Sequence, residues 1–168
     1  NADGFDSWLN NMWEKNGVTN YFGAGTGGLG WTGFAYLAMD DFPDEWARQM
    51  VETWAMDSED GFYLNGYMCT KAQKDWDLVP NKNFMVTPDT TWFAFRGMYK
   101  HHVIDRANEL TLFHLKNYNM KWCIPIAPEA MKETLELHGD AFSNFNAGKI
   151  LLILEGIFGL SYSVVGDT

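Results

Sequence analysis

The chain has 168 residues, of which 46% are hydrophobic and 16% aromatic, so it can bury a core and is not an unstructured tail. Its formal net charge is -10 and its pI is near 4.6, a balance that excludes a nucleic-acid partner, because such a partner needs clustered Lys and Arg. The longest apolar stretch is too short to span a membrane. We expect a single helical domain over residues 1–168.

Six segments repeat their hydrophobic residues with helical spacing, and two kinds of segment alternate along the chain. In the first kind the apolar residues occupy one face, which predicts a helix with one side in water. In the second kind they occupy almost the whole circumference, which predicts a helix surrounded by protein. The amphipathic segments are residues 5–14, 45–55 and 105–117, and the buried segments are residues 31–39, 88–99 and 148–158.

The connections between these segments differ in length in a regular way. Short turns precede the amphipathic helices, whereas long connections precede the buried ones. These connections are the glycine-rich residues 17–30, the irregular residues 69–88, which follow a turn and a strand-like segment at 62–68, and residues 122–145. The glycine-rich stretch lacks the GK[ST] ending of a phosphate loop, so we interpret it as a tight loop. Long loops inside a compact domain are usually functional, and here they should gather at one end of the buried helices.

The alternation predicts an all-α fold of α/α-hairpins, a toroid in which inner helices are wrapped by outer helices and long irregular loops lie at one end. The alternative is an ordinary orthogonal helical bundle in which the long loops have no function. The chain begins without Met and ends in a short apolar run, so we expect it to be a fragment of a larger domain.

Three parts of the chain carry a resemblance to known enzymes: the acidic turn and DGFY-like strand at residues 54–63, the start of a buried helix at residues 87–95, and the late loop and helix at residues 124–128 and 142–160. These parts resemble the six-hairpin glycosidases, the (α/α)6-toroid group that includes trehalases, processing glucosidases and mannosylglycerate-hydrolase-type enzymes. The resemblance implies a carbohydrate-active domain, a glycoside hydrolase acting on an oligosaccharide or glycan. Six helices make about three hairpins, so it also implies the C-terminal half of such a toroid.

Glycoside hydrolysis needs two carboxyl groups, one acting as the acid and the other as base or nucleophile. In a toroid they come from the loops before the inner helices, which leaves Asp75, Asp77, Glu129 and Asp140 as candidates. We predict Asp77 and Asp140 as the catalytic pair. Aromatic and hydrogen-bonding side chains suit sugar binding, and for this role we predict Trp31, Asp75, Trp76, His138 and Asn144. Each carboxylate can instead cap a turn or a first helical turn.

Other reactive residue types have structural interpretations. Glu155 is a lone carboxylate on a helix expected to be buried, so it needs a partner or must be protonated, and we expect a structural partner rather than catalysis. Adjacent His101 and His102 point in different directions on a helix and suit its C-terminus better than a shared metal. Cys69 and Cys123 lack metal-type spacing, and the sequence allows either a disulfide or two thiols. We expect no metal and no other cofactor.

The alternative function is a noncatalytic subunit that binds a glycan or packs into an assembly. Half a toroid leaves inner helices uncovered, a large apolar surface that soluble monomers rarely tolerate. We therefore expect the remainder of the toroid, or other copies of the chain, to cover this edge. Of the possible locations, an extracellular or secreted one is favoured.

Overall fold

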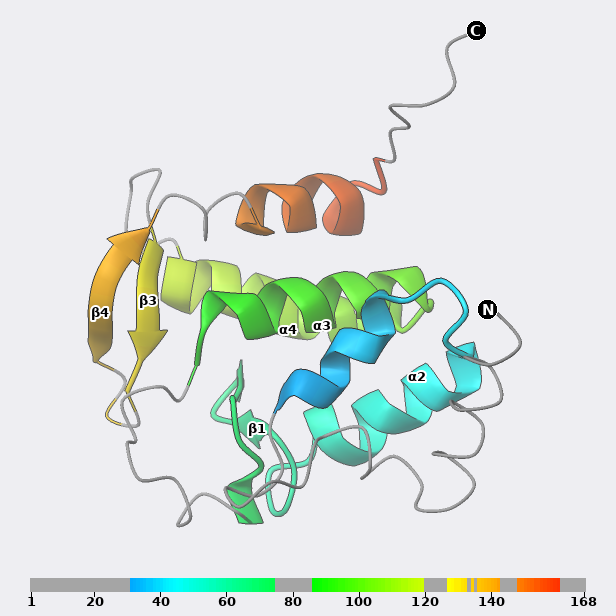
Figure 1. Ribbon diagram of the computed structural model, residues 1–168, viewed down its shortest axis with the longest axis horizontal. Helices are drawn as coiled ribbons and strands as arrows, with labels where there is room; N and C mark the ends of the chain where they lie inside the picture. Colours follow the sequence, from blue (N-terminus) through cyan, green and yellow to red (C-terminus); the bar gives the residue numbers. More distant parts are fainter. Residues whose placement is uncertain are drawn as a thin grey trace, which may run out of the picture.

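The computed structural model describes residues 31–74, 86–119, 127–132, 134, 136–142 and 148–160. Helices make up most of this part of the chain, and two short antiparallel hairpins complete it (Figure 1). The expectation of a mainly helical protein is confirmed. The predicted helix at residues 5–14 and the glycine-rich loop at residues 17–30 lie outside the described residues.

The helices begin and end close to their predicted positions. Pro88 opens one of them, because its fixed φ suits the first helical position and its missing N–H would have no partner there. Asp44 and Glu45 open another, where carboxylates face the positive end of the helix dipole. The helices are η2 (Trp31–Ala38), α2 (Asp44–Met50) with its continuation η3 (Val51–Ala55), α3 (Pro88–Lys100), α4 (Ile104–His114) with its continuation η5 (Leu115–Asn119), and a helix over residues 148–157 that ends in η6 (Leu152–Ile157).

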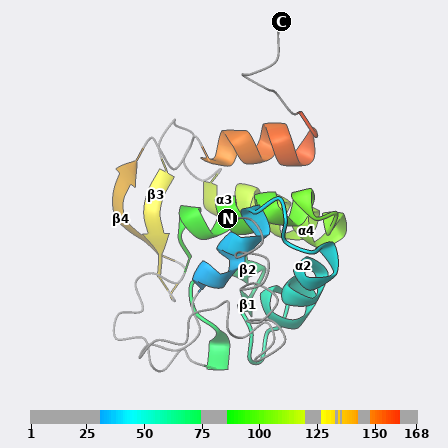
Figure 2. The same ribbon diagram turned by 45° about the vertical axis from the view of Figure 1, so that its right-hand side comes forward.

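Three of these helices lie in a row, which we call the helix layer: η2, α3 and the 148–157 helix. The middle helix, α3, contacts both of the others (Figure 2). Glycines allow the close approach on each side. A Cβ atom on Gly97 of α3 would lie 2.3 Å from the Cβ of Leu37 in η2, and a Cβ on Gly156 would lie 2.5 Å from the ring of Tyr99. The segments predicted to be buried are therefore neighbours in space.

The amphipathic segments pack outside this layer. Helix α4 contacts α3 and buries Ala107 and Leu110. Arg106, on its polar side, donates to Glu52 of η3 over 3.1 Å, so the two outer helices are linked. The side chains of α2 and η3 that face inward join one hydrophobic core with the layer, and the largest fully buried members of that core are Phe34, Phe62, Phe95, Leu37, Met50, Met68, Met98 and Leu110.

The first hairpin pairs β1 (Tyr63–Leu64) with β2 (Tyr67–Met68). Its turn is Asn65-Gly66, and both residues have positive φ, 51° and 92°. This is the dipeptide that a two-residue hairpin turn of matching twist prefers. Gly66 also lies against the ring of Phe113, where a Cβ atom would be 2.3 Å from a ring carbon. The strand-like segment predicted at residues 62–68 is thus a hairpin.

The second hairpin pairs β3 (Ala127–Met131) with β4 (Leu137–Phe142) and falls where we predicted an irregular loop. Glu129, considered as the start of a short helix, lies in β3 instead. Pro128 and Gly139 are unusual in strands, which is why the segment does not have a strand pattern. Backbone pairing between the two strands outweighs these local preferences.

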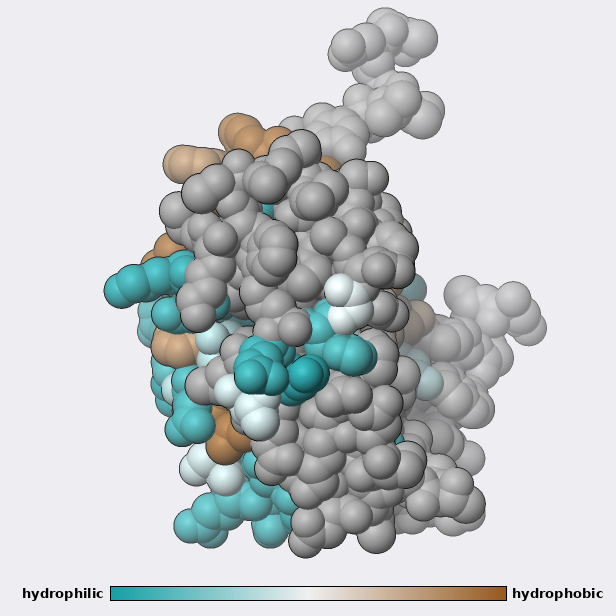
Figure 3. All heavy atoms as spheres, turned by 90° about the vertical axis from the view of Figure 1, so that its left-hand side faces the viewer, coloured by the Kyte–Doolittle hydropathy of each residue, from teal (hydrophilic) through white to brown (hydrophobic). Residues whose placement is uncertain are grey.

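The 148–157 helix differs from its prediction in one respect. Leu152 is buried, but Ile150 is 53% exposed and Phe158 is 68% exposed. The apolar surface that results is visible as brown atoms at the top of Figure 3, over this helix. The prediction that protein surrounds this helix on every side is therefore wrong for the described structure, because the helix forms the edge of the layer and contacts α3 on one side.

Candidate functional site

The three layer helices point the same way. The helices pack together near their C-terminal ends. Leu37 of η2 contacts Gly97 of α3, and Gly156 of the 148–157 helix contacts Tyr99 of α3. Their starts lie on the side of the molecule that carries β3 and β4, on the left in Figure 1. The connections at the C-terminal end are short, residues 39–43 and 101–103, whereas residues 56–87 and 120–147 return to the starts of the helices. The gathering of long connections at one end stays a prediction, because residues 75–85, 120–126 and 143–147 of these connections lie outside the described residues.

The backbone N–H groups in the first turn of α3 can interact with polar groups that accept hydrogen bonds. Thr87, its N-cap residue, has an extended backbone (φ -127°, ψ 152°), and no hydrogen bond from the first turn to the Thr87 side chain caps the helix. The first N–H groups of a helix have no partners within the helix and carry part of the positive end of its dipole. Carboxylates or hydroxyl groups placed at this end would therefore be stabilised.

Strand β4 contains a glycine bulge at the predicted site. Pro128 pairs with Ala141 and Ala130 pairs with His138, so Gly139 and Asp140 together stand opposite Glu129. Gly139 has φ 81°, a conformation that a residue with a Cβ atom adopts only at a cost. Bulges of this kind interrupt the alternation of a strand and are common beside active sites. Asp140, one of the two predicted catalytic residues, is the second residue of this bulge.

The other predicted site residues have different outcomes. Trp31 is the first residue of η2, and His138 is half-buried in β4, one residue before the bulge. The start of η2 and strand β4 both lie toward the end of the layer where the helices begin. The remaining residues, Asp75, Trp76, Asp77 and Asn144, lie outside the described residues. The described part of the site therefore consists of the start of η2, the start of α3 and the β3–β4 hairpin.

Polar side chains also gather at the opposite, C-terminal end of the layer, which the sequence interpretation did not predict as a site. Arg96 of α3 donates to Glu155 of η6 over 2.5 Å, which confirms that Glu155 has a structural partner. One turn later, Lys100 forms an ion pair with Asp40 and donates to the carbonyl oxygen of Ala38 over 2.8 Å. The spacing of Arg96 and Lys100 within the otherwise largely apolar residues 92–100 was the available signal.

His101 also fits the structural role predicted for the histidine pair. Its Nδ1 lies 2.8 Å from Oδ1 of Asp44, and its Nε2 lies 3.2 Å from the carbonyl oxygen of Met39. The hydrogen bond from His101 lowers the pKa of the Asp44 carboxyl. His101 therefore connects the end of α3 to the start of α2. Within the described residues no group of three or more His, Cys, Asp or Glu side chains is arranged to hold a metal ion.

Another buried histidine, His114, connects α4 to the first hairpin. Its Nε2 accepts a hydrogen bond from the backbone N–H of Met68 over 3.0 Å, so the proton of the neutral ring is on Nδ1. The rings of Tyr67 and Phe95 pack edge-on against it. Burial lowers the pKa of His114 to about 3, because the charged form would lose its hydration. His114 is thus a neutral core residue rather than a candidate acid or base.

We expect the protein to lose stability on acidification because of His114. Its folded pKa, about 3, is below the unfolded value of about 6.5, so the unfolded chain binds the proton first. The free energy of unfolding is unaffected by the titration of His114 above pH about 6.5. Below that pH the titration of His114 lowers it by about 1.4 kcal/mol for each pH unit, until the folded pKa is reached. Urea unfolding at pH between about 7.5 and 5 would measure this slope.

The matched variants for this prediction are His114→Gln and His102→Gln. Gln at position 114 can still accept from Met68 but does not titrate, so its unfolding free energy should depend less on pH than that of the unaltered protein. His102 is exposed, and its replacement should leave the slope unchanged. If the free energy of unfolding depends equally on pH in the unaltered protein and in His114→Gln, His114 is not the group responsible for the loss of stability on acidification.

Comparison of the chain with family models, with curated proteins and with solved structures found no significant match. The resemblance to six-hairpin glycosidases stays a prediction that depends on the quoted segments. None of the helices that the structure describes combines the length and the apolar character needed to cross a bilayer. Cys69 is a buried free thiol, and Cys123 lies outside the described residues.

Proposed function

We propose that this chain belongs to a carbohydrate-active toroid domain that hydrolyses glycosidic bonds. The observation that carries the proposal is the common direction of η2, α3 and the 148–157 helix, with the β3–β4 hairpin at the end where they begin. Inner helices that begin at one end, joined by long connections, are what the predicted toroid requires. The glycine bulge at Asp140 supports placing the active site at this end of the helices, since bulges are common beside active sites.

In this proposal Asp77 and Asp140 divide the two carboxyl roles. One protonates the glycosidic oxygen as the bond to the anomeric carbon breaks, and the other activates a water or attacks that carbon. A separation of about 5–5.5 Å between the carboxyl groups would give retention of configuration, and about 6.5–9.5 Å would give inversion. Sugar rings would stack on Trp31 and Trp76, and their hydroxyl groups would bond to Asp75, His138 and Asn144.

The direct experiment is to incubate the natural polypeptide that carries this chain with a panel of neutral oligosaccharides. Released monosaccharides are separated by anion-exchange chromatography. We expect release from at least one gluco- or manno-configured substrate, at a rate that rises with protein concentration and is abolished by heat denaturation. Absence of release across the panel, with the protein folded, would contradict hydrolysis.

A second candidate function is favoured by one specific observation, the apolar edge of the 148–157 helix. Ile150, Leu154 and Phe158 recur every four residues and are 53%, 39% and 68% exposed. A noncatalytic subunit that binds a glycan or assembles with other copies would bury such a stripe. Sedimentation distinguishes the two functions: assembly of the chain together with an absence of hydrolysis would favour this candidate, whereas a monodisperse monomer of the 168-residue chain would count against it.

A further inference from the structure

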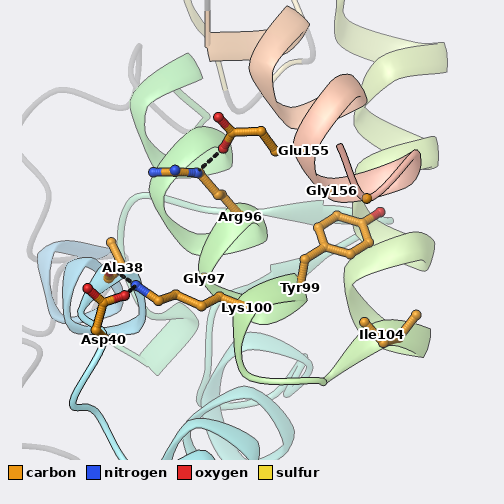
Figure 4. A pocket seen from close by; sticks show the side chains of 10 residues that line it. Ala38, Asp40, Arg96, Gly97, Tyr99, Lys100, Ile104, Glu155 and Gly156 are labelled. Atoms are coloured by element: carbon orange, nitrogen blue, oxygen red, sulfur yellow. Dashed lines mark hydrogen bonds and ion pairs between the residues drawn. The ribbon is translucent and has the colours of Figure 1, made fainter. Parts of the chain in front are cut away.

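A pocket lies between α3 and the 148–157 helix, at the end of the layer where these helices finish, and we call it the C-terminal pocket (Figure 4). Its volume is about 410 Å³, within the usual range of about 300–1,000 Å³ for small-molecule sites. The side chains or backbone of Asp40, Arg96, Tyr99, Lys100, Glu155 and Gly156 contribute to its lining. It is at the opposite end of the layer from β4 and so is separate from the proposed active site.

The charges around the C-terminal pocket balance. Arg96 and Lys100 stand one turn apart on α3, and each is paired with a carboxylate from a different segment, Glu155 on one side and Asp40 on the other. Two cations and two carboxylates give no net charge, so the pocket offers little attraction to a simple anion or cation. A pocket lined by both cations and carboxylates suits hydroxyl groups, which accept from guanidinium and ammonium groups and donate to carboxylates.

The pocket also has an aromatic wall. Tyr99 presents the flat side of its ring to the view in Figure 4, and its hydroxyl group donates to Asn108 over 2.9 Å. Because Tyr99 lines the pocket, its ring carbons can contact a ligand while its polar tip is satisfied. Gly156 lies beside this ring, and Gly159 (φ 64°), which also lines the pocket, has open space where a Cβ atom would be.

We propose that the C-terminal pocket is a second carbohydrate-binding site, which takes a neutral sugar of one or two rings. One face of the sugar packs on Tyr99, and its hydroxyl groups exchange hydrogen bonds with Arg96 and Glu155. The site binds the sugar but does not cleave it. It holds the polypeptide on a glycan independently of the residues at the other end of the layer. This assignment does not depend on hydrolysis.

Amide hydrogen exchange, measured by mass spectrometry on the natural polypeptide with and without maltose, tests the site. Roughly 100 mM maltose suits the millimolar affinity expected of a small neutral ligand. We expect maltose to slow exchange in residues 96–101 and 153–160. An absence of protection in these segments would overturn the proposal, whether or not maltose affects residues 127–142. The same concentration of glycine or inorganic phosphate should give no protection there, and equal protection by either would overturn the assignment to a sugar.

Three variants make the test specific. For each variant, amide exchange with maltose is compared with exchange of the same variant without maltose. Arg96→Met should raise the maltose concentration for half-maximal protection by about 10-fold, because a charged hydrogen-bond donor is lost. Arg106→Met is the matched control: Arg106 is similarly exposed, at 40% against 43%, but bonds to Glu52 and Glu109 on the outer helices. Equal weakening by both would overturn the proposal.

The third variant leaves the ion pairs in place. Gly159→Asn adds a side chain at the pocket wall, and Asn tolerates the left-handed φ of 64° found there. We expect it to weaken maltose protection by about 10-fold or more while the unfolding midpoint stays close to that of the unaltered protein. Unchanged protection would overturn the proposal. Hydrolysis, if present, should persist in all three variants, so failure of this site and failure of the active site are distinguishable.

Discussion

Replacing Asp140 or Asp77 by Asn is expected to lower the rate of glycoside hydrolysis by about 100- to 10,000-fold. Asn has nearly the same shape as Asp, but it neither transfers a proton nor attacks an anomeric carbon. The fall should appear in kcat, because the acid and base act in the transition state rather than in substrate binding. Steady-state release of monosaccharide by each variant measures it.

The control for this prediction is Asp105→Asn. Asp105 is an exposed carboxylate in the first turn of α4, on the outer side of the fold, so its replacement should leave turnover unchanged. Circular dichroism of all three variants shows whether each has folded. Unchanged turnover in both Asp77→Asn and Asp140→Asn would remove these residues from the mechanism, and equal losses in all three variants would indicate a general effect of charge.

Replacing Gly97 by Val is expected to lower the free energy of unfolding by about 3 kcal/mol. A Cβ atom at this position would lie 2.3 Å from the Cβ of Leu37 and 2.7 Å from its backbone carbonyl carbon and oxygen. Rotation of a side chain cannot relieve contact with backbone atoms, so η2 and α3 would have to separate. For a protein of this size the unfolding midpoint should fall by roughly 6–12 °C.

Ala35→Val provides the comparison. Ala35 is on the same helix as Leu37 but is exposed, so the larger side chain should change the unfolding free energy by at most about 0.5 kcal/mol. Gly97→Ala should give an intermediate loss, since it adds the clashing atom without the two methyl groups of Val. Similar stability in Gly97→Val and Ala35→Val would mean that η2 and α3 do not approach closely, and the helix layer would then be wrong.

The helices were predictable because their signals are local. The 3.6-residue spacing of apolar residues, the acidic turn before α2 and Pro88 before α3 all act within a few residues, and the observed bounds agree with them. The turn Asn65-Gly66 is local in the same sense. In contrast, β3 and β4 are held by pairing between strands that contain Pro128 and Gly139, and no short-range pattern reports such pairing.

The candidate site was only partly predictable for a similar reason. Asp140 and His138 could be chosen from residue type and their place in a long connection, but the bulge at Gly139 depends on the register with β3. Glu155 was recognisable as a carboxylate in need of a partner. Its partner, Arg96, is 59 residues earlier in the chain, and only the packing of α3 against the 148–157 helix brings them together. The pocket around them is a product of that packing.

The location of a bound oligosaccharide tests the proposed function most directly. A crystal of the natural polypeptide carrying Asp140→Asn, soaked with a substrate found in the hydrolysis panel, would retain the intact sugar. We predict that the sugar lies where η2 and α3 begin, in contact with β4 and with Trp31. A sugar bound only in the C-terminal pocket beside Arg96 and Tyr99, or at neither end of the helix layer, would contradict an active site at the start of the layer helices.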